Sequence, residues 1–283
     1  MIEQQSGIAA PAQSTLHVGS DVPFNIGLAI LGGTYVLLIV AMLIADAQYT
    51  TLPKLLNSLT SPEIRYAIKL SLISCTITTI LALWSAVPLG YMLSRYEFPG
   101  KGLVDAILDI PVVLPPLVIG LSLLILFQTP LFRAIDSVFP ITYAVPSVIL
   151  AQFAVSCAFA VRTMKVTFDQ INPRSEQVAL TLGCTRSQAF WMVTLPEARR
   201  GILTAATLAW ARSLGEFGPI LIFSGATRLR TEVLSTTVFL ELSVGNIEAA
   251  VAVSLLMILA AVLVLTIVRL FGSEMTLGKA AEP

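Results

Sequence analysis

Few residues of this 283-residue chain are of the types that carry out chemistry. The chain has one histidine, His17, and three cysteines, Cys75, Cys157 and Cys184, which show no paired spacing. A zinc site, a disulfide framework and a histidine-based active site each need more of these residues at defined spacings. The sequence therefore predicts no metal site, no disulfide framework and no catalytic residues.

One pair of opposite charges lies inside an apolar stretch, residues 201–227, that is long enough to cross a membrane. Ionisable residues at that depth cost about 2.5–3.5 kcal/mol each on insertion scales and usually face a bundle interior or an aqueous cavity. Arg212 and Glu216 are four residues apart, so they share a helical face and can neutralise each other. We interpret them either as a buried pair that fixes helix packing or, with Ser213 and Gly218, as the lining or gate of a translocation path.

The rest of the composition is that of an integral membrane protein. Hydrophobic residues make up 56% of the chain and charged residues 12%, whereas a soluble chain has about 25% charged residues. Seventeen basic residues balance seventeen acidic ones. With so few charges there is no basic stripe for a phosphate backbone, which excludes nucleic-acid binding.

Six stretches are long and apolar enough to cross a bilayer, which takes about 20 residues at ~1.5 Å per residue. They are residues 24–45, 70–94, 110–132, 137–161, 201–227 and 249–268. Barrel strands would be ~10 residues long with alternating polarity, and the sequence lacks that pattern. We therefore predict an all-α membrane protein with six transmembrane helices.

Positive charges in the loops predict the orientation, because cytoplasmic loops carry an excess of Lys and Arg. One side has ten such residues, most of them in 162–200, and the other side has six. An even number of spans then places both termini and residues 162–200 in the cytoplasm. We expect the first span to stay as an uncleaved anchor despite Ala45-Asp46-Ala47, because its apolar run is too long for a signal peptide and no Lys or Arg precedes it.

Three prolines predict a kink in the third span. Pro111, Pro115 and Pro116 each remove a helical hydrogen bond, which is tolerated in a membrane where neighbours or cavity water satisfy the freed carbonyl. The kink either serves packing or marks a bent, pore-lining helix.

Residues 162–200 form the sizeable polar insertion between spans, and we predict two short helices in it. The helix signals are Asn172 and Pro173 at the first start, Gly183 after the first end at Leu182, Thr185 with Gln188 as a capping box, and Leu195-Pro196 at the second end. Such a helical pair, partly apolar, indicates either a partner protein or a segment lying flat on the membrane with Trp191 as its anchor.

The spacing within this insertion resembles the EAA motif of ABC importer permeases: Glu-Ala-Ala, three residues, Gly, nine residues, Ile-x-Leu-Pro. Here Gln177-Val178-Ala179 stands for Glu-Ala-Ala, Val193 replaces Ile, and Gly183 and Leu195-Pro196 match. Glu176 lies immediately before the position of the family's Glu. The resemblance implies a coupling helix that seats in a cleft of a separate ATPase subunit through Glu176, Gln177, Ala179, Gly183, Leu195 and Pro196.

The chain itself has no Gly-x4-Gly-Lys-[Ser/Thr] loop for binding ATP phosphates. ATP hydrolysis must therefore take place on another polypeptide. We expect a transport subunit rather than an enzyme, with no cofactor of its own and with ATP used by the partner ATPase.

A second stretch narrows the resemblance. Residues 211–218, Ala-Arg-Ser-Leu-Gly-Glu-Phe-Gly, are similar to the permeases of molybdate, tungstate and sulfate importers, and most of all to the molybdate kind. The resemblance covers about residues 66–271 and implies the type I ABC importer permease architecture, with a cytoplasmic coupling helix between helices four and five. We thus expect a cytoplasmic tail (1–23), a six-span permease domain (24–271, coupling loop 162–200) and a second cytoplasmic tail (272–283).

We therefore expect the permease subunit of an ATP-driven importer in the cell (inner) membrane. It would carry an oxyanion by alternating access, and the candidate ions in order are molybdate or tungstate, then sulfate. The implied partners are a second permease copy or a paralogue, a cytoplasmic ABC ATPase dimer, an extracytoplasmic substrate-binding protein and the lipid bilayer. Since a selective anion site needs several convergent donors, and Arg212 has its own acid nearby, we expect weak contact with the ion in this subunit.

Other functions stay open at this point. A permease for another solute, such as a polyamine or phosphate, would have the same architecture. An ion-coupled secondary transporter would need intramembrane acids for its coupling ion, and Glu216 is the one candidate. An intramembrane enzyme would need a nucleophile–base pair at membrane depth, whereas the histidine lies in the N-terminal tail.

Overall fold

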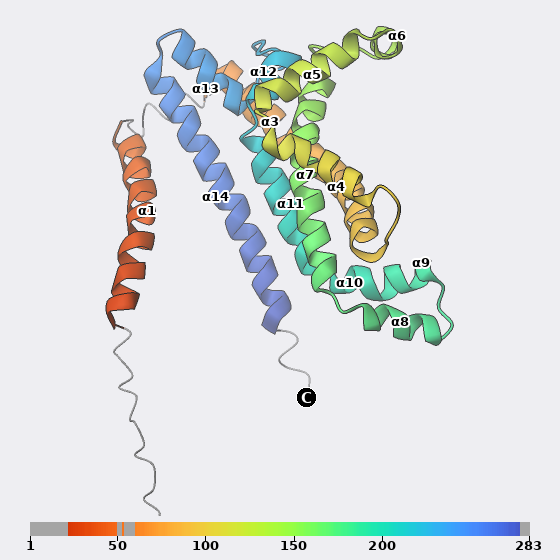
Figure 1. Cartoon of the computed structure of the whole chain (residues 1–283). Coiled ribbons are helices and arrows are strands. Elements are labelled where there is room, and N and C mark those ends of the chain that lie inside the picture. The colour runs from red at the N-terminus through yellow and green to blue at the C-terminus, as the bar shows by residue number, and fades with distance from the viewer. Residues whose placement is uncertain (1–21, 50–52, 54–59, 278–283) are drawn as a thin grey trace, which may run out of the picture. The chain divides into compact units, whose positions relative to one another are not determined.

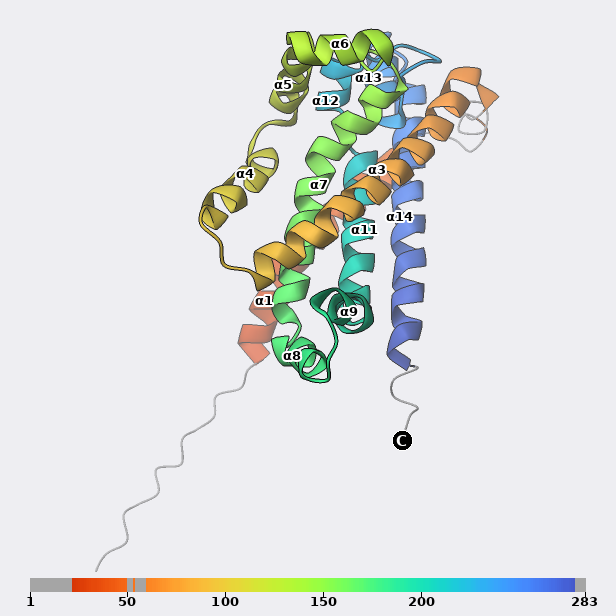
Figure 2. The same cartoon turned by 90° about the vertical axis from the view of Figure 1, so that its right-hand side faces the viewer.

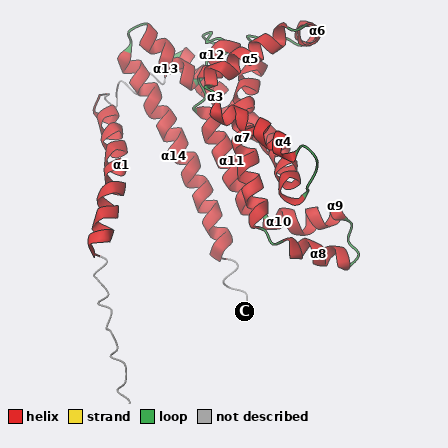
Figure 3. Cartoon of the chain, in the orientation of Figure 1, coloured by secondary structure: helices red, strands yellow, loops and turns green. Residues whose placement is uncertain are grey.

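The computed structural model describes residues 22–49, 53 and 60–277, with residue 23 and those after 266 by backbone alone. Every regular element among these residues is a helix (Figure 3). Most of the predicted tail 1–23 and the end of the predicted tail 272–283 lie outside the described residues. The chain divides into two units, residues 1–48 and 49–283, which we describe separately.

The first unit contains helix α1 (Val22–Tyr49), which covers the predicted first span. Its 28 residues reach about 42 Å at 1.5 Å per residue, more than the ~30 Å of a hydrocarbon core. The side chains of α1 are mostly apolar, and the helix contains no Asp, Glu, Lys or Arg before Asp46.

The second unit is built on three helices that pack together, α3 (Pro62–Arg95), α7 (Val145–Gln170) and α11 (Arg199–Leu214), with α14 (Ile247–Leu277) beside α11 (Figures 1 and 2). The shorter elements are α4 (Lys101–Val113), α5 (Pro116–Gln128), α6 (Pro130–Val138), α8 (Pro173–Thr181), α9 (Arg186–Ala189), the π-helical turn η1 (Phe190–Thr194), α10 (Leu195–Glu197), α12 (Gly218–Phe223) and α13 (Leu234–Ser243).

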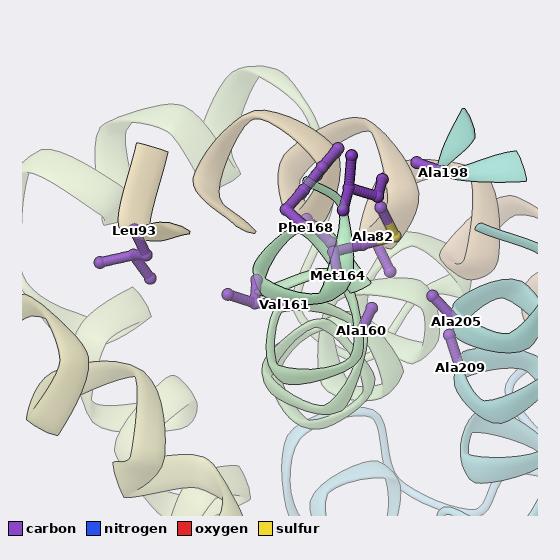
Figure 4. Close-up of a cluster of buried hydrophobic side chains, with 11 residues drawn as sticks. Ala82, Leu93, Ala160, Val161, Met164, Phe168, Ala198, Ala205 and Ala209 are labelled. Carbon is purple, nitrogen blue, oxygen red and sulfur yellow. The ribbon is translucent and has the colours of Figure 1, made fainter. Parts of the chain in front are cut away.

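Small residues let the three central helices approach closely. Ala160 of α7 and Ala205 and Ala209 of α11 are fully buried in one cluster (Figure 4). A Cβ atom at Gly90 of α3 would lie 2.7 Å from Cβ of Met164 on α7. Because lipid tails are as apolar as the helices, close backbone packing of this kind is a main source of helix association in membranes.

The helices of the structure correspond to some of the six predicted membrane spans better than to others. Among the described residues, four helices are long and apolar enough to cross a membrane, and a fifth span results if α4 and α5 are counted as one bent helix. The predicted fifth span, 201–227, is divided between α11 and α12, each too short to span alone. Six transmembrane helices therefore stay a prediction.

The predicted third span, residues 110–132, is divided among the end of α4, all of α5 and the start of α6 rather than forming one kinked helix. Helices α4 and α5 meet at an angle of 113°, with Leu114 in an extended conformation between them. Pro115 disfavours helical geometry at the residue before it, and Pro116 suits the first position of the next helix. Pro111 lies within α4 without ending it.

The polar insertion between helices is shorter than the predicted range, residues 162–200. Helix α7 continues past Arg162 and Lys165 to Gln170, so the insertion begins at Ile171. Both basic side chains bind Asp105 of α4, Arg162 Nη1 at 2.8 Å and Lys165 Nζ at 2.9 Å, and Arg162 also pairs with Asp109. Since these charges have partners on a neighbouring helix, they do not require a loop.

Most of the shorter helices lie at one end or the other of the second unit, and α4 lies between the ends (Figures 1 and 2). Helices α8 and α9 lie at one end, and α5, α6, α12 and α13 lie at the other (Figures 1 and 2). The C-terminal end of α14 lies at the same end as α8 and α9 (Figures 1 and 2).

Candidate functional site

The polar insertion folds as a helical hairpin, residues 172–197, whose first helix begins and ends where the sequence predicts. Asn172 Oδ1 accepts a hydrogen bond from the backbone N–H of Arg174 at 3.0 Å. At the other end, Gly183 has φ +92° and Cys184 donates its N–H to Ala179 O at 3.1 Å. This is a Schellman motif, which needs a left-handed residue at the position of Gly183.

The second half of the hairpin starts with the predicted capping box. Gln188 donates its N–H to Thr185 Oγ1 at 3.3 Å, and its Oε1 accepts from the N–H of Thr185 at 2.8 Å. The predicted stop at Leu195-Pro196 differs in detail, because the helix passes through η1, in which Leu195 donates to Phe190 O, and ends after Glu197. The π-turn tolerates Pro196, since the proline starts a new turn where no N–H is required.

The six predicted coupling residues are spread over the hairpin: three lie in α8, one in the turn and two in α10. Gln177, Gly183 and Pro196 are exposed, Glu176 and Leu195 are half-buried, and Ala179 is buried. The exposed side also carries large apolar side chains, with Val178 56% and Leu182 79% exposed. Apolar groups on a polar segment typically mark a contact surface for a partner.

The half-buried Glu176 faces two residues that sequence reasoning missed. Its Oε1 accepts a hydrogen bond from the Tyr91 hydroxyl at 2.5 Å, and its Oε2 lies 3.9 Å from Nε of Arg95. Both partners belong to the last two turns of α3. Nothing in the sequence signals this contact, because the residues are far apart along the chain.

The predicted pair of charges is present at the break in the fifth span. Nη1 of Arg212 lies 2.6 Å from Oε2 of Glu216, although α11 already ends at Leu214. Glu216 is 1% exposed and the Arg212 side chain 29%. The guanidinium also lies 5.6 Å from the ring centre of Phe159, within reach of a cation–π interaction.

Ser213 lies in a buried polar chain that joins the three central helices. Its hydroxyl is 2.8 Å from that of Ser156, and its carbonyl accepts a hydrogen bond from Gln152 Nε2 at 3.2 Å. Gln152 Oε1 in turn accepts from Thr78 Oγ1 at 3.1 Å. Gln152 is the one amide side chain in the predicted fourth span, residues 137–161. An amide at that depth could have pointed to a buried hydrogen-bond network.

Gly218 takes part in a backbone crossing between the two broken spans. A Cβ atom at Gly218 would lie 3.0 Å from the N of Leu117, and one at Gly120 would lie 2.7 Å from Cα of Pro219. Helices α5 and α12 are thus in direct backbone contact. The prolines of the third span and the glycines of the fifth, which the sequence shows as separate weak points, meet at this crossing.

The candidate site consists of ion pairs and close backbone contacts between helices. Among the residues that the structure describes, no group of three or more His, Cys, Asp or Glu side chains could hold a metal ion. The hairpin at one end and the broken helices at the other are connected by α11, which runs without interruption from Arg199 to Leu214.

Replacing Glu216 by alanine is expected to destabilise the chain. The change leaves the Arg212 guanidinium without its carboxylate, and loss of one partner of a buried pair costs about 3–5 kcal/mol. We expect about 3 kcal/mol, because Arg212 is 29% exposed and can reach water. The melting temperature in detergent measures the effect, with Glu97→Ala, which removes an exposed pair with Lys101, as the control. Equal melting temperatures for the two variants would contradict the pairing.

This chain is similar in sequence to a family of known transport proteins. Residues 86–276 match the family described as "Binding-protein-dependent transport system inner membrane component". The sulfate transport system permease protein CysT of Salmonella typhimurium is 30% identical over 90% of this chain and 93% of its own length. The molybdate/tungstate transport system permease protein WtpB of Thermococcus kodakarensis is 34% identical over 67% and 74%. The molybdenum transport system permease protein ModB of Mycobacterium tuberculosis is 32% identical over 88% and 94%.

A solved structure shows the same architecture. The chain superimposes with a TM-score of 0.71 on a crystal structure of a bacterial alginate ABC transporter in complex with its alginate pentasaccharide-bound periplasmic protein, at 19% identity and over 90% of this chain and 94% of that one. At that identity the likeness establishes the fold alone. Family match, relatives and fold agree: the chain belongs to the binding-protein-dependent transport system inner membrane components, the permeases of ABC importers.

Proposed function

We propose that this chain is the membrane-spanning permease subunit of an ATP-driven importer that moves an oxyanion into the cytoplasm, with molybdate or tungstate as the first candidates and sulfate as the next. The observation that carries the proposal is that one helix, α11, connects the hairpin to the Arg212–Glu216 pair. Its 16 residues extend about 24 Å, so a displacement at the hairpin is passed to the break between α11 and α12.

The mechanism follows from which parts are rigid and which are hinged. Helix α11 is unbroken from Arg199 to Leu214 and packs against α3 and α7 through the alanine-rich cluster. It therefore moves as a rigid element. Residues 215–217 lie between two helices, and Gly215 permits a change of backbone direction there. Beyond this hinge, α12 is in backbone contact with α5. A tilt of α11 would therefore shift α5 and α12 together, which is the kind of two-position element that alternating access needs.

The partners follow from the surfaces. The exposed apolar side chains of the hairpin, Val178, Leu182, Trp191 and Met192, suit a cleft of a cytoplasmic ATPase dimer, with both chain termini on the same side of the inner membrane. A second permease copy or a paralogue would complete the translocation path. An extracytoplasmic binding protein is supported by the solved relative, which was crystallised with its periplasmic protein.

The choice of substrate rests on the relatives. Those reported above are named for sulfate, molybdate/tungstate and molybdenum transport, and residues 211–218 fit the same group. Arg212 already has Glu216 as its partner, so the path holds the anion weakly. Selectivity then belongs to the binding protein, and the permease supplies a route that lets the ion leave.

Uptake by proteoliposomes tests the proposal. The chain is reconstituted with its ATPase and binding protein, and molybdate, tungstate, sulfate, phosphate and spermidine are offered in turn. We expect accumulation of molybdate, tungstate or sulfate only when ATP is supplied. Uptake of phosphate or spermidine instead would contradict the substrate, and uptake driven by an ion gradient without ATP would contradict the importer class.

A further inference from the structure

Glu176 connects α8 and η1, which belong to the hairpin, with α3 of the membrane-spanning part. It lies in the first turn of α8, and its carboxylate contacts Tyr91 on α3 at 2.5 Å and Thr194 on η1 at 3.4 Å. Its side chain is 15% exposed. One carboxylate oxygen is therefore engaged by α3 and the other by η1, at the wall of a surface pocket that Gln177 also lines.

Arg95 strengthens the same connection. This residue ends α3, and its Nη2 donates a hydrogen bond to the carbonyl of Ile171, where the hairpin leaves α7, at 2.8 Å. Its Nε lies 3.9 Å from Oε2 of Glu176. The end of α3 thus contacts the hairpin at its entry and again at the first turn of α8.

Aromatic packing fixes the position of the Tyr91 hydroxyl. The Tyr91 ring packs edge-on against Phe168 of α7 and Phe190 of η1, with ring centres 5.5 and 4.7 Å apart. Edge-to-face contacts at these distances are favourable. The hydroxyl is therefore held in place to meet Glu176, which is what a contact needs in order to transmit motion.

The neighbouring residue, Gln177, is exposed, and it lines the same surface pocket as Tyr91, Arg95 and Glu176. Successive residues on a helix point about 100° apart, so two adjacent polar side chains can serve different surfaces. In this chain the acidic residue is hydrogen-bonded to α3, and the exposed amide occupies the position of the first residue of the EAA motif.

We propose that Glu176 is a positioning residue that fastens the hairpin to the end of α3, so that the hairpin, α3 and α11 move as one body, and that it does not contact the ATPase. This proposal rests on the proposed function. Without the Tyr91–Glu176 contact, the hairpin would bind the ATPase and follow its motion but would transmit less of it to the membrane helices.

The test compares Glu176→Ala, Glu176→Gln, Tyr91→Phe and the double variant Tyr91→Phe/Glu176→Ala with Gln177→Ala in the reconstituted complex. We expect Glu176→Ala to bind ATPase within twofold of wild type but to lose at least tenfold in ions transported per ATP. Glu176→Gln, which keeps an acceptor for Tyr91, should recover part of that ratio. The double variant should be no worse than Glu176→Ala alone, because both changes remove one contact. Gln177→Ala should weaken ATPase binding and leave the ratio unchanged.

Two results would overturn the proposal: a Glu176→Ala variant that loses ATPase affinity at an unchanged transport ratio, or effects of Tyr91→Phe and Glu176→Ala that simply add. The double-mutant cycle is also measured as melting temperature of the chain alone in detergent, where additivity would again exclude the contact. If the wild-type chain binds no ATPase, the proposed function fails, and the melting cycle still decides whether Glu176 anchors the hairpin.

Discussion

Replacing Gly120 by alanine is expected to lower the stability of the chain and to reduce ATP-dependent uptake at least tenfold. The added Cβ atom would lie 2.7 Å from Cα and 3.0 Å from O of Pro219. These are backbone atoms, so no side-chain rotation relieves the overlap. Overpacking costs about 1–3 kcal/mol, and we expect the upper part of that range. Separation of α5 from α12 would also disconnect the two broken spans.

The control for this prediction is Gly102→Ala. Gly102 lies in α4, and a Cβ atom there would meet nothing within 4 Å. Alanine in an open helical position stabilises by about 0.4–1 kcal/mol. The melting temperature in detergent and the uptake rate are measured for both variants. If Gly120→Ala melts and transports like Gly102→Ala, the crossing of α5 and α12 is not close.

Replacing Gly183 by valine is expected to abolish transport while leaving the membrane helices folded. Gly183 has φ +92°, a conformation that costs an L-residue roughly 1–2 kcal/mol and is rarer still for a β-branched one. No atom lies within 4 Å of the position of a Cβ atom there. The variant therefore changes the turn between the hairpin's helices without disturbing the core.

The matched variant is Gly183→Asn, because asparagine tolerates the left-handed conformation. We expect it to retain most of the uptake, while Gly183→Val retains the wild-type melting temperature to within a few degrees but neither binds the ATPase nor supports uptake. Normal uptake by Gly183→Val would show that the hairpin does not couple to an ATPase.

Local signals predicted the hairpin well, because capping depends on residues that are neighbours in sequence. Asn172, Gly183 and the Thr185–Gln188 box take the predicted conformations. The pairing of Arg212 with Glu216 was predictable for the same reason. In each case the partners are at most a few residues apart, so no knowledge of the tertiary fold was needed.

Contacts between distant segments were beyond reach of the sequence. The partner of Glu176 is Tyr91, 85 residues away, and Gly120 meets Pro219 only once two spans have broken and crossed. Three prolines predicted a kink but not the angle of 113°, because the direction of a break depends on what packs against it. Arg162 and Lys165 suggested a loop, since the sequence does not reveal Asp105 as their partner.

The most direct test of the central claim is the content of molybdenum, tungsten and sulfur in cells grown at trace supply of each. The comparison uses cells that lack this chain, the same cells with wild-type chain restored, and cells restored with Gly183→Val. The account predicts a loss of molybdenum or tungsten that the wild-type chain reverses and the variant does not. Unchanged content of all three elements on removal of the chain would contradict import of an oxyanion.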